Sequence, residues 1–142
     1  MDLIKKKDLK SRSAFTLIEL LIVLAIIGAL MSIGIPIYTG ALDSAKATVV
    51  ASNIRTISDG VRMDLMLNNE ASKTASKYIQ LDNTEINNYH VNYSDTGDEW
   101  RIEIGYNGNM ATPKKIKEKL KGCNEKLTDS NSATCVVEVP KM

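Results

Sequence analysis

The chain of 142 residues is poor in the side chains that build catalytic and metal sites. It has one histidine, His90, and two cysteines, Cys123 and Cys135, without a Cys-x-x-Cys spacing. A structural zinc site needs about four such ligands, so this composition argues against one. His90 has no serine or cysteine nucleophile motif beside it, and no glycine-rich phosphate-binding loop is present. We therefore expect no enzyme, no cofactor and no metal.

The chain also lacks a strong excess of either charge, because its formal net charge is only +1. A dedicated nucleic-acid-binding domain is usually strongly basic, so DNA binding would need a local patch. A short helix predicted from Pro113, with Ile116 and Leu120 inward, carries four lysines that could form one: Lys114, Lys115, Lys117 and Lys119. These lysines are either a solvated helix face or a surface for DNA or another anion.

Charge is almost absent from the long apolar run between Phe15 and Ile35, where Glu19 is the exception. At about 1.5 Å per residue this run makes roughly 31 Å of helix, enough to cross a bilayer. It is longer than the apolar region of about 7–15 residues in a secretory signal peptide, which favours a retained membrane helix. Five basic residues precede it and predict a cytoplasmic N-terminus with the rest of the chain outside: Lys5, Lys6, Lys7, Lys10 and Arg12.

Glu19 is the feature of this run that needs a physical explanation. A carboxylate at the centre of a membrane helix costs about 2.5–3.5 kcal/mol on insertion scales, so such a residue is a functional hypothesis. Glu19 has either a specific partner or an interfacial position from which its carboxylate extends to the headgroups.

From Ala14 to about Tyr38 the chain resembles the N-terminus of type IV pilins, through the block Phe-Thr-Leu-Ile-Glu-Leu that starts at Phe15. The resemblance implies a leader, residues 1–14, which a prepilin peptidase removes by cutting between Ala14 and Phe15. Phe15 would then be the first mature residue and would be N-methylated. The family usually has glycine before the cut, where this chain has alanine. Residues 15–37 would form the transmembrane and filament-core helix, and residues 38–142 the globular head.

The spacing between Phe15 and Glu19 suggests how Glu19 is used in assembly. Four residues at about 1.5 Å each place the carboxylate some 6 Å along the helix from the amine that cleavage would create. A neighbouring subunit shifted by that distance brings its Phe15 amine level with Glu19, and the two buried charges satisfy each other only in register. The same spacing also permits a pair within one chain, so the partner stays open.

Three residues weaken the predicted helix near the membrane exit: Gly28, Gly34 and Pro36. Glycine lowers helix stability by about 1 kcal/mol and an interior proline by about 3 kcal/mol. The resemblance to pilins implies that this segment extends during assembly. A simple kink at the membrane exit is the alternative.

The head is predicted as an α+β unit in which the amphipathic half of the long helix, continuing to about residue 67, packs on a small antiparallel sheet. Two neighbouring stripes on the helix need covering: Leu42, Ala45 and Val49, and Val50, Ile54, Ile57, Val61 and Leu65. After a connecting loop, residues 68–88, alternation predicts a hairpin over 89–93 and 100–106. A third strand is predicted over 135–139, within a final region of sheet and disulfide loop, 89–142.

Cys123 and Cys135 lie on the outward side of the membrane helix, where oxidising conditions favour a bridge. The loop of about 13 residues would stabilise the head by roughly 3 kcal/mol in the chain-entropy model. The pair also resembles the C-terminal disulfide loop of many pilins. Asp95, Asp98 and Glu99 lack the spacing of a calcium loop and fit the hairpin turn better.

The predicted function is that of a structural subunit that waits in the inner membrane, meets prepilin peptidase and the pilus assembly machinery, and polymerises with its own copies into an extracellular filament. Such filaments serve adhesion, motility or DNA uptake. A pseudopilin of a type II secretion system and a membrane-anchored adhesion module that never polymerises are the two alternatives.

Overall fold

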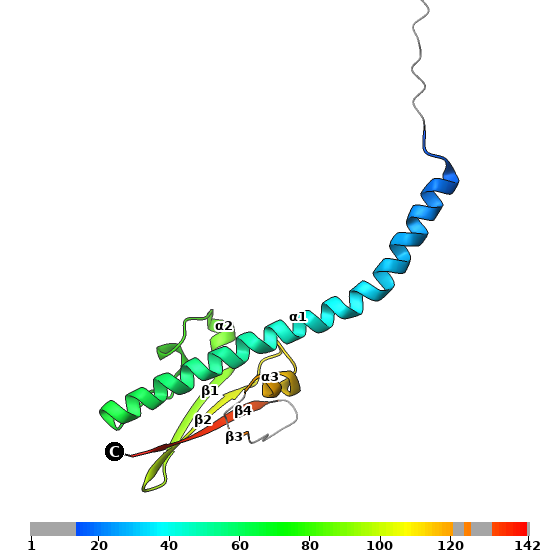
Figure 1. Ribbon diagram of the computed structural model, residues 1–142. Helices are drawn as coiled ribbons and strands as arrows, with labels where there is room; N and C mark the ends of the chain where they lie inside the picture. Colours follow the sequence, from blue (N-terminus) through cyan, green and yellow to red (C-terminus); the bar gives the residue numbers. More distant parts are fainter. Residues whose placement is uncertain (1–13, 121–123, 126–131, 142) are drawn as a thin grey trace, which may run out of the picture. The chain divides into compact units, whose positions relative to one another are not determined.

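The computed structural model describes residues 14–120, 124–125 and 132–141. They divide into two units, one ending at Tyr38 and one starting at Thr39. Helix α1 (Leu17–Asn68) runs from the first unit into the second (Figure 1). The first unit contains only the start of α1 and the residues before it, whereas the second contains the rest of α1 and every strand.

Helix α1 is continuous even though Pro36 lies inside it. It ends where Asn69 takes up a left-handed conformation, with φ of 53°. The Asn69 N–H donates to the Leu65 carbonyl at 3.0 Å, which satisfies a carbonyl at the helix end. Asparagine is one of the few residues other than glycine that tolerates this conformation. The prediction of one long helix that continues to about residue 67 is therefore confirmed.

The sheet has the strand order β1-β2-β4-β3 and is antiparallel throughout. Its three long strands are β1 (Tyr89–Asp95), β2 (Glu99–Tyr106) and β4 (Ala133–Pro140). Both the predicted hairpin and the predicted third strand are confirmed. The two-residue strand β3 (Asn124–Glu125), which pairs with β4, was not predicted. Gly97, with φ of 101°, lies in the turn between β1 and β2, where a residue with a side chain would be strained.

Three short helices connect these elements. The turn η1 (Ala75–Lys77) and helix α2 (Asn83–Ile86) lie in the segment 68–88 that was predicted as a connecting loop, so that prediction was incomplete. Helix α3 (Pro113–Lys119) confirms the predicted helix after the hairpin, with Ile116 and Leu120 each only 1% exposed.

The core lies between α1 and one face of the sheet (Figure 1). One predicted stripe of α1 is fully buried, namely Val50, Ile54, Ile57, Val61 and Leu65. Ile102, Ile104 and Val139 of the sheet are also fully buried. The neighbouring stripe was wrongly expected to be covered, because Leu42 is 41% and Val49 50% exposed. The sheet covers a single face of the helix. This arrangement is the α+β layout of a long N-terminal helix packed on a small antiparallel sheet.

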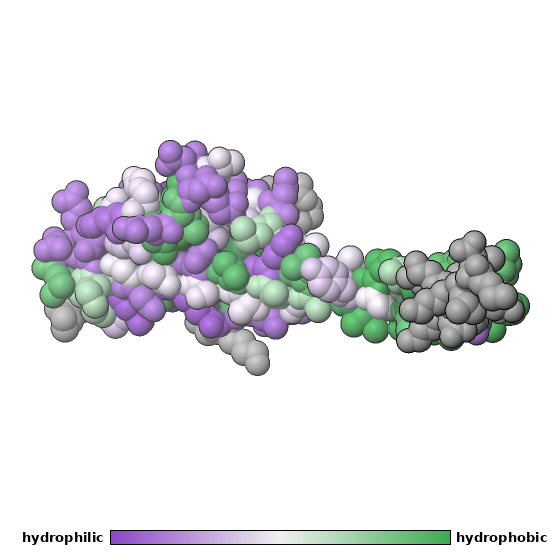
Figure 2. Space-filling model, turned by 90° about the horizontal axis from the view of Figure 1, so that it is seen from above, coloured by the Kyte–Doolittle hydropathy of each residue, from purple (hydrophilic) through white to green (hydrophobic). Residues whose placement is uncertain are grey.

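In the first unit, no side chain of α1 is buried. Figure 2 shows hydrophobic residues gathered along this part of the helix, whereas the surface of the second unit is mostly hydrophilic. The exposed apolar side chains extend from Phe15, at 88%, to Ile37, at 67%. A helix that is apolar on all sides needs a bilayer or other chains around it.

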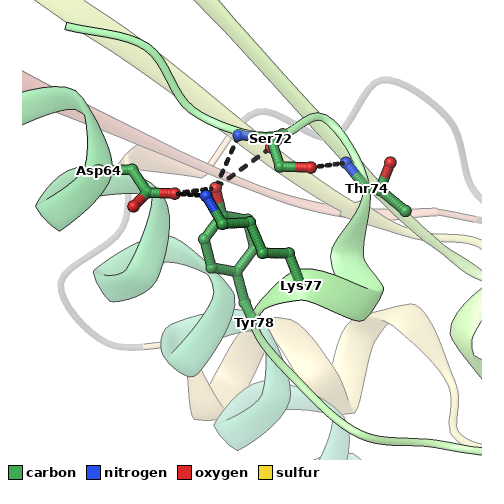
Figure 3. A network of polar contacts seen from close by, with 5 residues as sticks. All are labelled: Asp64, Ser72, Thr74, Lys77 and Tyr78. Carbon is green, nitrogen blue, oxygen red and sulfur yellow. Dashed lines mark hydrogen bonds and ion pairs between the residues drawn. The ribbon is translucent and has the colours of Figure 1, made fainter. Parts of the chain in front are cut away.

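Tyr78 fastens the segment after α1 back onto that helix (Figure 3). Its hydroxyl donates to Asp64 Oδ2 at 2.8 Å, and the Ser72 N–H donates to the same hydroxyl at 2.9 Å. Lys77 Nζ reaches Asp64 Oδ2 at 2.6 Å, and the Thr74 N–H donates to Ser72 Oγ at 3.1 Å. Hydrogen bonds from Lys77 and Tyr78 hold the pKa of Asp64 below its ordinary value. The network thus joins α1 to the residues around η1.

Tyr106 forms a second anchor at the end of β2. Its hydroxyl donates to Glu85 Oε1 at 3.0 Å and accepts from the Met110 N–H at 3.3 Å. Its ring lies 4.9 Å from that of Tyr89, centroid to centroid, and the Tyr89 hydroxyl accepts from Asn53 Nδ2 at 3.0 Å. These contacts connect α1, α2 and the turn after β2.

We expect Tyr78 and Tyr106 to resist ionisation in alkaline solution. Burial, followed by the hydrogen bond to a carboxylate, raises the pKa of each phenol from 10.0 to about 12. Because the folded-state pKa is the higher one, the stabilisation is complete below pH 10 and is lost as the pH rises towards 12. The ultraviolet absorbance of tyrosinate should show Tyr78 and Tyr106 titrating last, with a pKa of about 12 each, and Tyr78→Phe should remove one of these two steps. Joint titration of all tyrosines at their ordinary pKa would contradict this prediction.

Candidate functional site

The candidate site lies at the start of α1, where Thr16 and Glu19 form a reciprocal cap. The Thr16 N–H donates to Glu19 Oε2 at 2.7 Å, and the Glu19 N–H donates to Thr16 Oγ1 at 3.3 Å. Thr16 immediately precedes the helix and Glu19 is its third residue. This is the capping box, in which two unpaired donors of the first turn are satisfied together.

The role of Thr16 was missed from the sequence, although a signal for it was present. The spacing Thr-x-x-Glu ahead of an apolar run is the pattern of a capping box. The partner of Glu19 was sought instead at the Phe15 amine, which exists only after cleavage. In the uncleaved chain the carboxylate is occupied within its own first turn.

The segment around Glu19 has the length and composition of a membrane span. An 18-residue window of α1 reaches a mean hydropathy of 2.7 with none of its residues buried. Glu19 is the one charged residue between Leu17 and Ile37. Length and composition therefore allow this helix to cross a bilayer, with the carboxylate near its N-terminal end.

The predicted cleavage site and the predicted helix-weakening positions lie on either side of Glu19. Ala14 and Phe15 precede the helix and are exposed. Gly28, Gly34 and Pro36 all lie within continuous helix, and a Cβ built at either glycine meets no atom within 4 Å. Extension of this segment during assembly remains a prediction.

The predicted disulfide falls partly outside the described residues. Cys135 lies on β4 opposite Ile104 and is fully buried. Cys123 is not among the described residues, so its pairing with Cys135 stays a prediction. Among the residues that the structure describes, no group of three or more potential metal ligands occurs.

The four lysines of the predicted anionic-surface patch are not equivalent. Lys115 is half-buried, and its Nζ lies 3.2 Å from Asp43 Oδ2 and 3.2 Å from the Gly40 carbonyl. The hydrogen bond from Lys115 lowers the pKa of Asp43. Lys114 and Lys119 are exposed, and Lys117 is half-buried. Lys115 therefore attaches α3 to α1, and Lys114 and Lys119 are the exposed lysines of the predicted patch.

The acidic hairpin turn is held by a lysine. Asp95 Oδ1 accepts from the Gly97 N–H at 2.8 Å and forms an ion pair with Lys141, whose Nζ also lies 4.6 Å from the centroid of the Trp100 ring. The hydrogen bond from Lys141 lowers the pKa of Asp95. The Asp95 carboxylate is already paired with the Lys141 ammonium group. This pairing favours a structural role for Asp95 in the turn over calcium binding.

Comparison with known proteins gives one match. A family model described as the prokaryotic N-terminal methylation motif matches residues 9–35. This motif is the class III signal peptide of type IV pilins. The searches of curated proteins and of solved structures found no match. The match indicates a type IV pilin-like prepilin protein. The motif is a structural one and not an enzymatic one. Together with the apolar N-terminal helix, it fits a membrane-anchored precursor.

Proposed function

We propose that this prepilin-like chain is the structural subunit of a type IV pilus, cut between Ala14 and Phe15, N-methylated on Phe15 and polymerised through α1. The observation that carries the proposal is a single carboxylate, Glu19, which lies inside the matched motif. The part of α1 around it, from Leu17 to Tyr38, has all of its apolar side chains exposed. General processing by a peptidase and assembly into a filament are implied by such a motif.

The exposed apolar surface on the N-terminal part of α1 fits two successive environments, first a bilayer and then a protein filament. About 31 Å of apolar helix suits storage in a bilayer. The same surface can later be covered by the helices of other subunits, since burying it in a protein filament also removes it from water. A soluble protein would leave such a surface exposed to water.

The capping box supports a defined role for Glu19 in assembly. Its Oε2 accepts from the Thr16 N–H at 2.7 Å. A carboxylate has about four acceptor positions, so Oε1 can accept from an incoming amine while the cap is kept. The Phe15 amine of a neighbouring subunit is the partner we assign to Oε1. The pair is satisfied only when the two helices are staggered correctly, and Glu19 thereby selects the stagger.

Electron microscopy of material sheared from cells with and without this gene tests the proposal. We expect filaments that disappear with the gene and contain this chain starting at N-methylated Phe15, as read by mass spectrometry. Short periplasmic filaments, together with protein secretion that is intact in cells with the gene and lost in cells without it, would instead identify a pseudopilin. A processed chain that stays in the membrane without filaments would identify a tethered adhesion module, and either result would overturn the proposal.

A further inference from the structure

The turn that follows β2 contains Asn107 followed by Gly108. We propose that Asn107 is a site of spontaneous deamidation, so that the folded protein slowly gains a carboxylate at this position. The reaction needs no enzyme and uses water as its one co-reactant. This inference does not depend on the proposed function.

The chemistry begins with the backbone nitrogen of Gly108. It attacks Cγ of Asn107 and gives up its proton, a C–N bond forms, the bond from Cγ to Nδ2 breaks, and Nδ2 leaves as ammonia. Water then opens the resulting five-membered imide at either carbonyl, which yields aspartate or its isoaspartyl isomer. Glycine as the following residue favours the first step, since it has no Cβ to obstruct the attack and adopts a wide range of backbone angles.

The fold itself requires glycine at position 108. A Cβ built there would collide with the Tyr106 hydroxyl and lie 2.9 Å from Nδ2 of Asn88. The Tyr106 hydroxyl cannot readily move, because it bonds Glu85 and the Met110 N–H. The reactive pair of residues is therefore a consequence of how Tyr106 anchors the turn.

The two reacting groups are accessible. Asn107 is exposed, and among the described residues the Gly108 N–H makes no hydrogen bond that would hold it back. Both residues line an open cavity of about 390 Å³ shared with Asp43 and Thr112, so water can reach the imide. The Asn107 N–H donates to the Asn88 carbonyl at 2.9 Å, which keeps one end of the turn in place.

His90 makes the product distinguishable from the starting state. Its Nε2 lies 2.8 Å from Asn107 Nδ2. Deamidation replaces a neutral amide beside the imidazole with a carboxylate, and the contact becomes a charge-assisted one. Because the chain has a single histidine, its imidazole NMR signals report this position alone.

The experiment is to incubate the purified full chain in detergent micelles at neutral pH and to follow it by peptide mass spectrometry and by NMR. We expect the mass gain of amide hydrolysis in the peptide containing Asn107, as a mixture of aspartyl and isoaspartyl forms. A second set of His90 signals should grow in proportion, and the aspartyl component should coincide with the signals of the N107D variant. Asn109, exposed in the same cavity but followed by Met110, is the internal control and should stay unchanged.

Two further samples keep the result decisive. The unfolded chain gives the intrinsic rate at Asn107, and Asn107→Gln keeps the amide but lengthens the side chain, which should abolish the change. The proposal is overturned if the folded chain keeps Asn107 intact while the unfolded chain converts, or if Asn109 converts as fast as Asn107.

Discussion

Replacing Glu19 by alanine should abolish filaments while the chain still inserts into the membrane. The substitution removes the one carboxylate from the apolar helix, so insertion becomes easier by about 2.5–3.5 kcal/mol at most. On the role proposed for Glu19, assembly would lose the group that selects the stagger, and the Phe15 amine of the neighbouring subunit would be left unpaired in a water-poor filament core. Microscopy of sheared material, together with membrane fractionation of the same cells, measures both effects.

Two matched variants separate the charge from the cap. Glu19→Gln keeps an oxygen that can accept from the Thr16 N–H but removes the charge, and we expect it to lose filaments as alanine does. Thr16→Ala removes the hydroxyl bound by the Glu19 N–H, which should weaken the helix start by about 1 kcal/mol and leave filaments in place. Normal filaments from Glu19→Ala or Glu19→Gln would refute the assigned role.

The second large effect is expected at Gly60, in the part of α1 that packs in the head. In an isolated helix Gly→Ala stabilises by about 1 kcal/mol, so propensity alone predicts a more stable protein. The structure predicts the opposite, since a Cβ at Gly60 would collide with Cδ1 of Tyr78 and lie 3.1 Å from its Cγ. Moving that ring would disturb its hydrogen bonds to Asp64 and Ser72. We expect Gly60→Ala to destabilise the head by about 1–3 kcal/mol, as overpacking does.

Thermal unfolding followed by near-ultraviolet circular dichroism measures this change, since the Tyr78 environment contributes to the signal. Gly40→Ala is the matched control, because it lies in the same helix and its Cβ would meet no atom within 4 Å. It should raise Tm slightly while Gly60→Ala lowers it. In a Tyr78→Ala background the penalty of Gly60→Ala should largely vanish. Equal effects at the two glycines would show that ring packing does not constrain Gly60.

Much of the fold follows from local pattern. Alternation of apolar and polar residues was sufficient to predict the two strands of the hairpin, and helical spacing predicted the buried stripe from Val50 to Leu65. The burial of the stripe with Leu42 and Val49 was predicted wrongly, since both side chains are exposed. Periodicity indicates which residues share a face of the helix, but the sheet determines how many of those faces are covered.

The sequence by itself determined three features: the helix that can span a membrane, its isolated carboxylate Glu19 and the methylation motif at its start. Length, hydropathy and a short motif are properties of consecutive residues. Tertiary structure alone decided why Gly60 and Gly108 must lack side chains, and which carboxylates Lys77, Lys115 and Lys141 meet. Most of these contacts join residues well separated in the chain, such as Gly60 and Tyr78 or Lys115 and Asp43. Packing geometry, unlike hydropathy, is not encoded in any one segment.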